Sequence, residues 1–413
     1  MDLHDTPQEA AFRAEVRAWL DENVPKHLLP ALEGASFGKS PFRGEEYLRH
    51  AREWQARKFD AGWACLHWPK KYGGREATPI QRIIWNQEEG PYRMLSGVFI
   101  IGHGMAAPTL MAYASEEQKR HYLPPMARGD EIWCQLFSEP SAGSDLAGIR
   151  TRSVREGDDW IVNGQKIWTS GAQHSKYGIL VTRSEFDLPK HKGLTYFFID
   201  MESPGVEVRP IKQVSGESQF NEVYFTNLRV PDAQRLGEVG AGWQVSLTTL
   251  MNERQAIGTS MAGGFAEILD YARRAPTGNG PAIRDAAVRD KLADFYVQSS
   301  GLRYTGLRSI SAISQGRTPG PENSIGKVVT GQMLQEIASL GLELQDQAGL
   351  LVAEDEAAYD ARFQFMLLRS LGVRIEGGTD EILKNIIAER VLGLPGDIRL
   401  DRDVSFKDIP SGW

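Results

Sequence analysis

Residues 160–170 read Trp-Ile-Val-Asn-Gly-Gln-Lys-Ile-Trp-Thr-Ser, and this stretch decides how the middle of the chain is interpreted. Two short apolar runs, Trp160–Val162 and Lys166–Trp168, flank the dipeptide Asn163-Gly164. Asn-Gly is a strong signal for a tight β-hairpin, because both turn positions need a positive φ. The stretch therefore predicts two strands joined by a turn at Asn163-Gly164.

More strand patterns follow this stretch. Short apolar runs bounded by turn residues predict strands at Tyr177–Thr182, Leu194–Asp200 and Glu222–Phe225. Together they predict a compact β-domain over residues 133–238.

The segments before and after this β-domain carry helical patterns. Thr6-Pro7-Gln8-Glu9 has the form of a capping box with proline at the first helical position. Near the other end, an apolar stripe recurs at steps of three and four, which is the spacing of one helix face. Its members are Val329, Met333, Ile337, Leu340 and Leu344. The sequence predicts a helical domain over residues 1–132 and a second one over residues 239–413.

Composition limits the class of protein. The 413 residues correspond to roughly three domain-sized units at about 150 residues each. A net charge of -7 argues against a dedicated nucleic-acid binder, which needs a basic excess. No apolar run reaches the ~18 residues of a transmembrane helix, and no secretory signal is visible. With only Cys65 and Cys134, a disulfide framework is excluded and a cytoplasmic location is expected. The histidines show no metal spacing, so no metal site is expected.

One glycine motif has two interpretations. Gly102-His103-Gly104-Met105-Ala106-Ala107 matches the Gly-x-Gly-x-x-Ala turn of dinucleotide-binding folds. The second strand with a terminal acid, which that fold needs about 20 residues later, is missing. Residues 115–121 read instead as a charged helix, so close helix packing is the favoured explanation.

Four stretches combine residue types that suit a bound cofactor or proton transfer. The segment Gln135–Asp145 offers hydroxyls and backbone N–H groups to a polar ligand, and Trp168-Thr169-Ser170 places an aromatic ring beside two hydroxyls. Glu253 precedes Arg254 on a predicted helix, and Glu376 precedes a Gly-Gly-Thr loop that meets a helix N-terminus. Each stretch alone also fits an ordinary loop, a core tryptophan or a solvated acid.

In this order and spacing, the stretches resemble the acyl-CoA dehydrogenase family across nearly the whole chain. The matching pieces are Gly62-Trp63, Trp68–Gly74, Ser138–Asp145, Asn163–Ser170, Gly377–Ile382 and Asn385–Leu394. The resemblance is to the bacterial fatty-acyl-CoA dehydrogenase type whose catalytic base lies on a helix. It implies an α+β, mostly α fold with an N-terminal helical domain, a central β-barrel-like domain and a C-terminal four-helix bundle.

The resemblance also implies FAD as the cofactor and assigns residues to it. Phe137 and Ser138 would lie against the isoalloxazine ring, Trp168 would stack on it, and Ser170 would bond near N5. Thr169, Thr379 and Glu381 also match positions that touch the cofactor. Ser144 would contact the acyl-CoA or the flavin. Gln345 and Gly349 resemble the segment that binds the adenine end of the neighbouring subunit's FAD. Substrate contacts are expected from Ser144, Arg254 and Gly377.

The activity implied is α,β-dehydrogenation of an acyl-CoA thioester to a trans-2-enoyl-CoA. A glutamate removes the α-proton while the β-hydrogen passes as hydride to flavin N5. Backbone donors such as the Gly377 N–H polarise the thioester carbonyl, and each such donor is worth about 3–4 kcal/mol. Shielding from water makes a carboxylate more basic. Electron-transferring flavoprotein is the expected acceptor, and fatty acid β-oxidation the expected context.

Two acids compete for the role of the base. Many family members carry it in Glu-Gly-Thr, but here two glycines precede Thr379, so Glu376 lies one residue early. Other members place the base on the earlier helix in a Glu-Arg pair, which Glu253-Arg254 matches. Glu253 is therefore the favoured base and Glu376 the second candidate.

One departure from the family pattern concerns assembly. The family shows Arg-x-x-Phe-Gly after the first bundle helix, where the arginine holds a neighbour's FAD pyrophosphate. This chain has Ala275–Gly280 there, and only Arg273 or Arg274 is available as a substitute. A homotetramer is the first expectation, with a dimer or a heterotetramer as alternatives. The alternative functions are a non-catalytic or half-site subunit of a heteromeric dehydrogenase, or an oxygen-using relative such as an acyl-CoA oxidase or a flavin monooxygenase.

Overall fold

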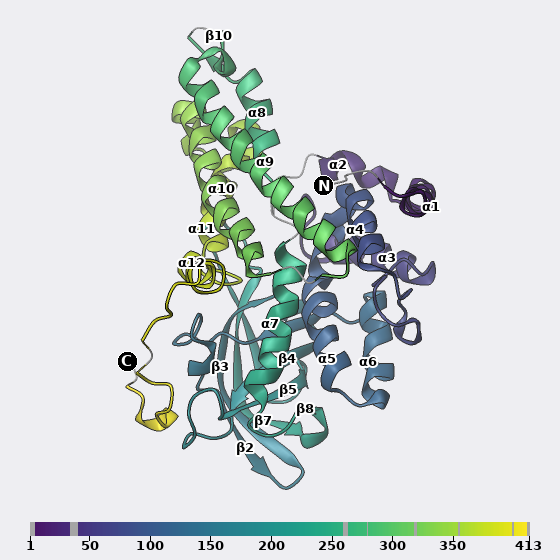
Figure 1. Ribbon diagram of the computed structural model, residues 1–413, viewed down its shortest axis with the longest axis vertical. Helices are drawn as coiled ribbons and strands as arrows, with labels where there is room; N and C mark the ends of the chain where they lie inside the picture. The colour runs from purple at the N-terminus through teal and green to yellow at the C-terminus, as the bar shows by residue number, and fades with distance from the viewer. Residues whose placement is uncertain are drawn as a thin grey trace. The chain divides into compact units, whose positions relative to one another are not determined.

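The structure is a computed structural model that describes residues 5–33, 40–258, 263–278, 280–317, 320–353, 356–398 and 400–410 (Figure 1). The chain divides into two compact units. We call one the bundle unit (Met1–Phe42, Pro79–Pro91 and Ile257–Gly396) and the other the sheet unit (Arg43–Thr78, Tyr92–Ala256 and Asp397–Trp413). Each unit is described by itself.

The sheet unit combines helices with one sheet. Its helices are α3 (Gly44–Asp60), α5 (Ala107–Tyr113), α6 (Glu116–Arg128) and most of α7 (Gly242–Gly258). Its strands are β1 (Trp133–Leu136), β2 (Arg152–Glu156), β3 (Asp159–Ser170), β4 (Tyr177–Arg183), β5 (Leu194–Asp200), β6 (Val206–Ile211), β7 (Phe220–Pro231) and β8 (Arg235–Leu236).

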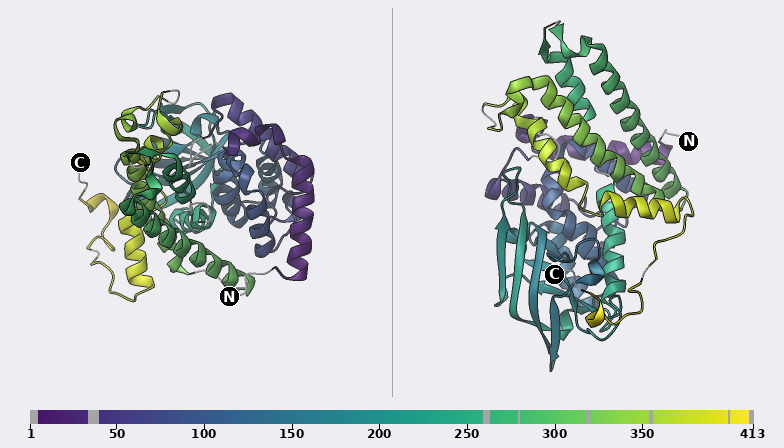
Figure 2. Two further views of the ribbon diagram at one scale, coloured as in Figure 1. Left: turned by 90° about the horizontal axis from the view of Figure 1, so that it is seen from above. Right: turned by 90° about the vertical axis from the view of Figure 1, so that its left-hand side faces the viewer.

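Within the described residues, the eight strands form one sheet in the order β6-β7-β3-β2-β4-β5-β8, and β1 pairs in parallel with β4. The strands run beside one another in Figure 2 (right). The predicted α+β class is confirmed. The sheet begins at β6 and ends at β8, and no hydrogen-bonded pair in the described part of the chain closes it into a barrel.

The predicted hairpin at Asn163-Gly164 is wrong. Residues 159–170 form the single strand β3, which pairs with β7 on both sides of a register shift between Val162 and Gly164. Asn163 accepts a hydrogen bond from the Asn227 backbone N–H at 2.8 Å, so the side chain that suits a turn holds a β-bulge instead. The actual hairpin joins β2 to β3 around Gly157.

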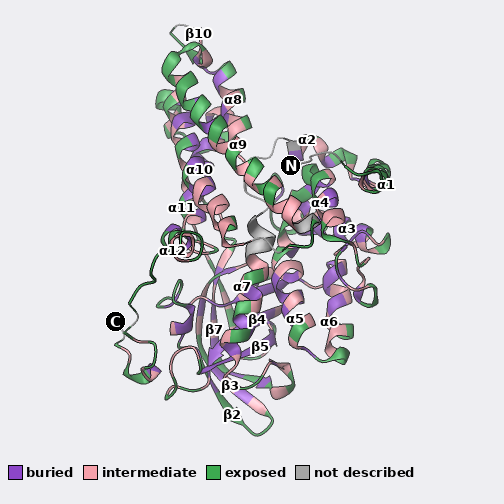
Figure 3. Cartoon of the chain, in the orientation of Figure 1, coloured by how far each residue is buried: buried purple, intermediate pink, exposed green. Residues whose placement is uncertain are grey.

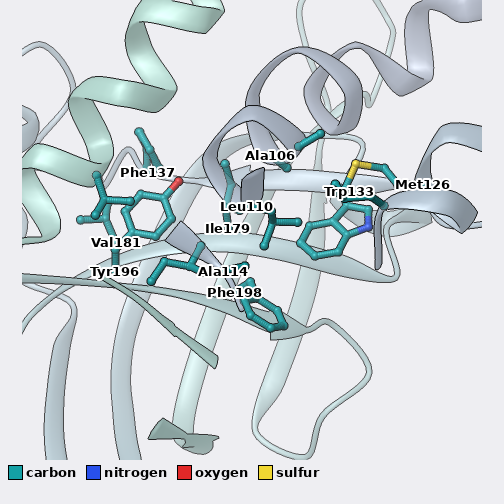
Figure 4. Close-up of a cluster of buried hydrophobic side chains, with 14 of the residues drawn as sticks. Ala106, Leu110, Ala114, Met126, Trp133, Phe137, Ile179, Val181, Tyr196 and Phe198 are labelled. Carbon is teal, nitrogen blue, oxygen red and sulfur yellow. The ribbon is translucent and has the colours of Figure 1, made fainter. Parts of the chain in front are cut away.

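Two of the apolar clusters in the described part of the sheet unit include residues of several strands. The larger contains residues of α5 and α6 together with β1, β4 and β5, and Figure 4 shows Leu110, Met126 and Trp133 in it. The second is made of residues from β1, β3, β4, β5 and β7, including Trp160 and Phe197. In Figure 3, β4 and β5 are largely coloured as buried. A sheet buried to this extent provides a rigid base for the loops at its ends.

The Gly102–Ala107 motif is helical. Residues 102–106 form a π-helical turn that leads into α5. A Cβ on Gly102 would meet Met126 and Trp133 at 3.4–3.6 Å, so the glycine allows close packing. The dinucleotide-binding interpretation is therefore excluded. Among the described residues, no single helix meets the length and hydropathy requirements of a membrane span, although the pair Gly90–Phe99 and Gly102–Tyr113, bent by 74°, passes jointly.

The bundle unit is helical. Its helices are α1 (Pro7–Asn23), α2 (Leu29–Glu33), α4 (Pro79–Glu88), α8 (Phe265–Arg274), α9 (Ala286–Ser314), α10 (Ser324–Gln345), α11 (Arg362–Val373) and α12 (Asp380–Arg390). The capping box at Thr6 and Glu9 is present. Residues of α8 to α11 form the apolar core, and Met333, Ile337 and Leu340 of the predicted stripe are buried in it. The two-residue strands β9 (Pro276–Thr277) and β10 (Gly280–Pro281) pair after α8.

The last described residues, 400–410, belong to the sheet unit although they follow the bundle helices in sequence. Ser405 forms an antiparallel bridge with Pro189, in the loop between β4 and β5. Each compact unit thus combines separate segments of the chain, whereas the sequence predicts three consecutive domains. The borders predicted at residues 132/133 and 238/239 stay a prediction.

Candidate functional site

Trp168 occupies a backbone conformation that is uncommon for a large residue. Its φ is +59°, and it falls within the second irregularity of the β3–β7 register, between Lys166 and Thr169. Regular alternation would place Trp168 on the same face as the buried Lys166. Instead, 56% of the surface of Trp168 is exposed. Strained residues and bulges concentrate at functional sites, where they redirect side chains.

The residues beside Trp168 leave hydrogen-bonding capacity unused. Thr169 is buried, and its hydroxyl has no hydrogen-bond partner among the described residues. Asn221, opposite Thr169 on β7, donates to the Thr169 carbonyl at 2.9 Å, and its own side-chain oxygen also lacks a partner in the described part of the chain. Ser170 is half-buried. Buried polar atoms are normally paired, so these atoms fit contacts with a polar ligand.

The loop after β1 lies directly against this part of β3. The Ile167 backbone N–H donates to the Ser138 carbonyl at 2.9 Å, so the two cofactor stretches predicted from the sequence lie together. Ser138 is half-buried. The Phe137 side chain is buried in the larger apolar cluster, edge-on to Tyr196 with ring centroids 5.8 Å apart (Figure 4). Its ring therefore packs in the core, and its backbone carries the loop.

A buried ion pair holds that loop in place. The Lys166 ammonium donates to the Glu139 carboxylate at 2.9 Å and to the Phe137 carbonyl at 2.8 Å. The backbone N–H groups of Arg150 and Thr151 donate to the same carboxylate at 2.6 and 2.8 Å. Burial by itself would raise the pKa of Glu139, but the Lys166 charge and these donors outweigh it and hold the pKa below its usual value.

Glu253 lies on α7 in the same unit. Its carboxylate accepts a hydrogen bond from the Gln135 side-chain amide at 3.1 Å. Gln135 lies on β1, two residues before Phe137. One helical turn earlier on α7, Thr249 joins a buried hydroxyl network with Tyr196 (2.9 Å) and Thr109 (2.8 Å). These bonds fix α7 against β1 and β5, and so fix the position of the Glu253 backbone.

Two more predicted residues belong to this unit. Ser144 is exposed in the loop after β1. Arg254 lies in α7, and its side chain is outside the part of the chain that the structure describes.

The second candidate acid lies in the bundle unit. Both carboxylate oxygens of Glu376 accept hydrogen bonds from Arg369, at 2.7 and 2.8 Å. Gly377 (φ +61°) and Gly378 (φ +97°) follow in conformations that favour glycine. The loop is held by an ion pair between Arg374 and Asp380 at 2.7 Å. Glu376 therefore belongs to an organised loop in which its charge already has a cationic partner.

Thr379 and Glu381 begin α12. The Thr379 hydroxyl caps the helix by accepting from the Ile382 N–H at 3.2 Å. Glu381 lies in the first turn, where hydrogen bonds from its own backbone N–H and from Thr379 lower its pKa. Both residues thus have a role in the fold, whatever they bind.

Gln345 and Gly349 lie at the end of α10. Gln345 is buried and accepts a hydrogen bond from Gln364 at 3.0 Å, while its amide donates to the Ala358 carbonyl at 3.3 Å. The Gly349 carbonyl accepts from Gln364 at 3.4 Å. The side chain of Gln345 therefore faces its own bundle, whereas the neighbouring Leu350 is 83% exposed.

Arg273 and Arg274, the two possible substitutes for the missing family arginine, lie in the last turn of α8. Arg274 pairs with Asp270, and its guanidinium lies 5.3 Å from the centroid of the Tyr359 ring. Tyr359 also donates to Asp270 at 3.3 Å. Both arginines are exposed, and Arg274 already has partners on its own bundle. Asn279 lies outside the described residues.

Sequence reasoning missed the role of Asn221 and the pairing of Glu139 with Lys166. Glu139 and Lys166 lie in stretches that the sequence singles out, but their contact becomes visible only when strand pairing is known, because residues 27 to 52 positions apart become neighbours. Gln135 lies at the start of a stretch singled out from the sequence, but its bond to Glu253 spans 118 residues. Among the described residues, no group of three or more His, Cys, Asp or Glu side chains is arranged to hold a metal ion.

Comparison with known proteins gives consistent matches along the chain. Three family models match in sequence order: the acyl-CoA dehydrogenase N-terminal domain over residues 6–130, the middle domain over 134–228 and the C-terminal domain over 240–392.

Relatives of mycobacterial origin are similar to this chain. The acyl-CoA dehydrogenase FadE34 of Mycobacterium tuberculosis is 38% identical over 81% of this chain, which spans only 45% of that protein. The acyl-CoA dehydrogenase IpdE1 of the same organism is 33% identical over 94% of this chain and 98% of its own length. Among solved structures, a chain of the ChsE4-ChsE5 complex from Mycobacterium tuberculosis is 31% identical with a TM-score of 0.78, and the match covers 96% of this chain and 100% of that one.

Proposed function

Because the chain belongs to the acyl-CoA dehydrogenase family, it is an FAD-dependent oxidoreductase, and we propose that it converts an acyl-CoA thioester to the trans-2-enoyl-CoA. One observation carries this proposal. Strand β1 holds the Glu253 carboxylate through Gln135 and leads two residues later into the loop at Phe137 and Ser138. A single rigid strand therefore connects the candidate base with the candidate flavin loop.

The residues around Trp168 fit a flavin. The exposed indole offers a flat apolar face. Beside it, the Thr169 hydroxyl and the Asn221 oxygen, which have no hydrogen-bond partner among the described residues, offer polar contacts. We assign the flavin contacts to Ser138, Trp168, Thr169 and Ser170, with Phe137 acting through its backbone. When bound, FAD supplies the acceptor for the β-hydrogen as hydride. The protein's part is to hold the ring rigidly and to exclude water.

Glu253 is the proposed base that takes the α-proton of the thioester. The Gln135 amide donates to one carboxylate oxygen and so orients the carboxylate. Glu376 is the weaker candidate because both of its oxygens already accept hydrogen bonds from Arg369. The Gly377 N–H, near the positive N-terminus of α12, is the proposed donor to the thioester carbonyl.

Other assignments rest on the resemblance to the family. We propose Ser144 and Arg254 as substrate contacts, and Thr379, Glu381, Gln345 and Gly349 as cofactor contacts. Electron-transferring flavoprotein is the proposed acceptor of the electrons. A homotetramer in the cytoplasm, acting in fatty acid β-oxidation, is the proposed setting.

Anaerobic titration tests the activity. The purified FAD-loaded protein is mixed with butyryl-, isovaleryl-, octanoyl- and 3-phenylpropionyl-CoA and with a steroid side-chain thioester. We expect one of them to bleach the flavin absorbance, with a product two hydrogens lighter by mass. If none bleaches the flavin, the proposed dehydrogenation is wrong. Rapid recovery of the colour in air would favour an acyl-CoA oxidase or a flavin monooxygenase over a dehydrogenase.

A second candidate function is supported by the end of α8. The family arginine is absent there, and Arg274 is engaged by Asp270 and Tyr359 on its own bundle. A chain of the ChsE4-ChsE5 complex, which its name gives as an assembly of two proteins, is similar along its whole length. We propose, as the alternative, that this chain is one subunit of a heteromeric dehydrogenase in which a partner subunit completes the FAD site.

A further inference from the structure

The segment after the bundle helices crosses to the sheet unit and docks on the loop between β4 and β5. We call residues 400–410 the C-terminal clasp. Its backbone N–H groups at Phe406 and Lys407 donate to the carbonyls of Leu188 (2.9 Å) and Phe186 (3.0 Å). Figure 2 (right) shows this segment, in yellow, beside the lower part of the sheet unit. The match to the family's C-terminal domain ends at residue 392, so the clasp lies beyond it.

Phe406 anchors the clasp. Its side chain is 3% exposed, and its ring centroid lies 3.5 Å from the guanidinium carbon of Arg183. A second guanidinium, that of Arg150, lies 5.1 Å away. Arg183 is itself fully buried on β4, so the ring and the cation shield each other from water. Cation–π contacts gain strength when they are desolvated in this way.

Arg183 connects Phe406 to the loop after β1 through hydrogen bonds. Its guanidinium donates to the carbonyl of Ile149 at 3.0 Å and to that of Ala147 at 2.5 Å. These two residues end the loop that carries Ser144. A ring that packs on Arg183 therefore limits the rotamers of the side chain that holds this end of the loop.

A second connection runs through Lys190. Its ammonium lies 2.6 Å from the carboxylate of Asp401 in the clasp and 2.9 Å from that of Asp145 in the loop. The Lys190 side chain is only 13% exposed, so solvent screens the two pairs less than it would on an open surface. Asp145 follows Ser144 directly. The clasp thus reaches both the middle and the end of the same loop.

We propose that the C-terminal clasp positions the Ser144 loop for acyl-CoA, with Phe406 and Asp401 as positioning residues that act through Arg183 and Lys190. This inference rests on the proposed function, because it takes the Ser144 loop as part of the substrate site. A clasp that only covered apolar surface would need neither the Lys190 bridge nor the bonds from Arg183 to the loop carbonyls.

The test uses full-length, FAD-loaded protein with Phe406→Ala or Asp401→Asn, and Arg402→Ala as the matched control on the exposed side of the clasp. Hydrogen–deuterium exchange is followed at the amides of residues 142–149 without substrate. We expect exchange to accelerate at least about fivefold in both variants, because local opening becomes easier, and to stay unchanged in the control. Asp401→Asn removes one charge and keeps the size of the side chain, so it remains informative if Phe406→Ala does not fold.

Kinetics separates this proposal from the function on which it rests. With the thioester of the titration panel that the wild type uses best, both variants are expected to raise KM several-fold and to change kcat and FAD content little. Unchanged loop exchange in Asp401→Asn would overturn the positioning role, even in an active enzyme. Faster exchange with an unchanged KM would overturn the link to acyl-CoA. A wild type that bleaches with no thioester would instead refute the proposed function, while the exchange result would still stand.

Discussion

At the scale of single residues, the Glu139–Lys166 pair holds the loop after β1, which we propose to contact the flavin. Both side chains are buried, and Lys166 connects the carboxylate with the Phe137 carbonyl. The pair is expensive to bury, but once it is formed, the removal of one partner leaves an uncompensated charge in the interior. Because the pair lies beside Ser138 and Trp168, we expect a change there to affect the proposed cofactor contacts indirectly.

Lys166→Met should therefore lower the free energy of unfolding by about 3–5 kcal/mol, because the Glu139 carboxylate loses its cation. It should also weaken FAD binding, since the loop loses its tie to β3. Denaturant unfolding and flavin titration measure the two effects, with Lys192→Met at an exposed position as the control. A loss of less than about 1 kcal/mol with unchanged FAD affinity would show that the pair does not hold the loop.

At this scale, the candidate flavin residues that the sequence singles out stay a prediction, but the structure shows which of them lie together. Trp168, Thr169 and Ser138 are selected from short local motifs, and the structure brings the backbones of these two motifs together. The positive φ of Trp168 and the bond between Gln135 and Glu253 could not be predicted. The first depends on the register between β3 and β7, and the second on a helix that follows more than 100 residues later.

At the scale of elements, helix ends and strand centres are predicted well and turns are not. Leu194–Asp200 is predicted with the bounds that the structure has, and the Thr6 capping box starts α1. Asn163-Gly164 carries the strongest turn signal in the chain, yet it forms a bulge. Pairing with β7 continues on both sides of it, and that partner strand is invisible to a local pattern.

Gly164→Ala tests the bulge. A Cβ at this position would meet Thr151 backbone at 2.7 Å, and the φ of +152° is unfavourable for other residues. We expect a loss of about 1–3 kcal/mol in unfolding free energy. Gly90→Ala, where a Cβ meets nothing within 4 Å, is the matched control. Equal stability of the two variants in thermal unfolding would contradict the close approach of Thr151 to β3.

At the scale of the whole molecule, the FAD site raises the question of assembly. Gln345, expected to bind a neighbour's FAD, and Arg274, one of two available substitutes for the family arginine, are engaged within their own bundle. Oligomeric contacts of this kind are not predictable from one sequence, because they depend on a surface that a second chain must match.

Flavin content of the protein expressed alone decides between the two assemblies. A homotetramer with complete sites should carry close to one FAD per chain, whereas a subunit that needs a different partner should carry about half of that or none. Absorbance after gel filtration measures the ratio of FAD to protein chains. As the control, the same ratio is measured after the second subunit of a native complex has been added. Full occupancy in the isolated chain would rule out the heteromeric alternative.

The central claim is that Glu253 removes the α-proton beside a flavin held at Trp168. Its most direct test is anaerobic titration of Glu253→Gln and Glu376→Gln with the thioester that bleaches the wild type. Glu253→Gln should keep its FAD and its yellow colour at every concentration, while Glu376→Gln bleaches. If Glu253→Gln bleaches like the wild type and Glu376→Gln does not, the base lies in the bundle loop and the account is wrong.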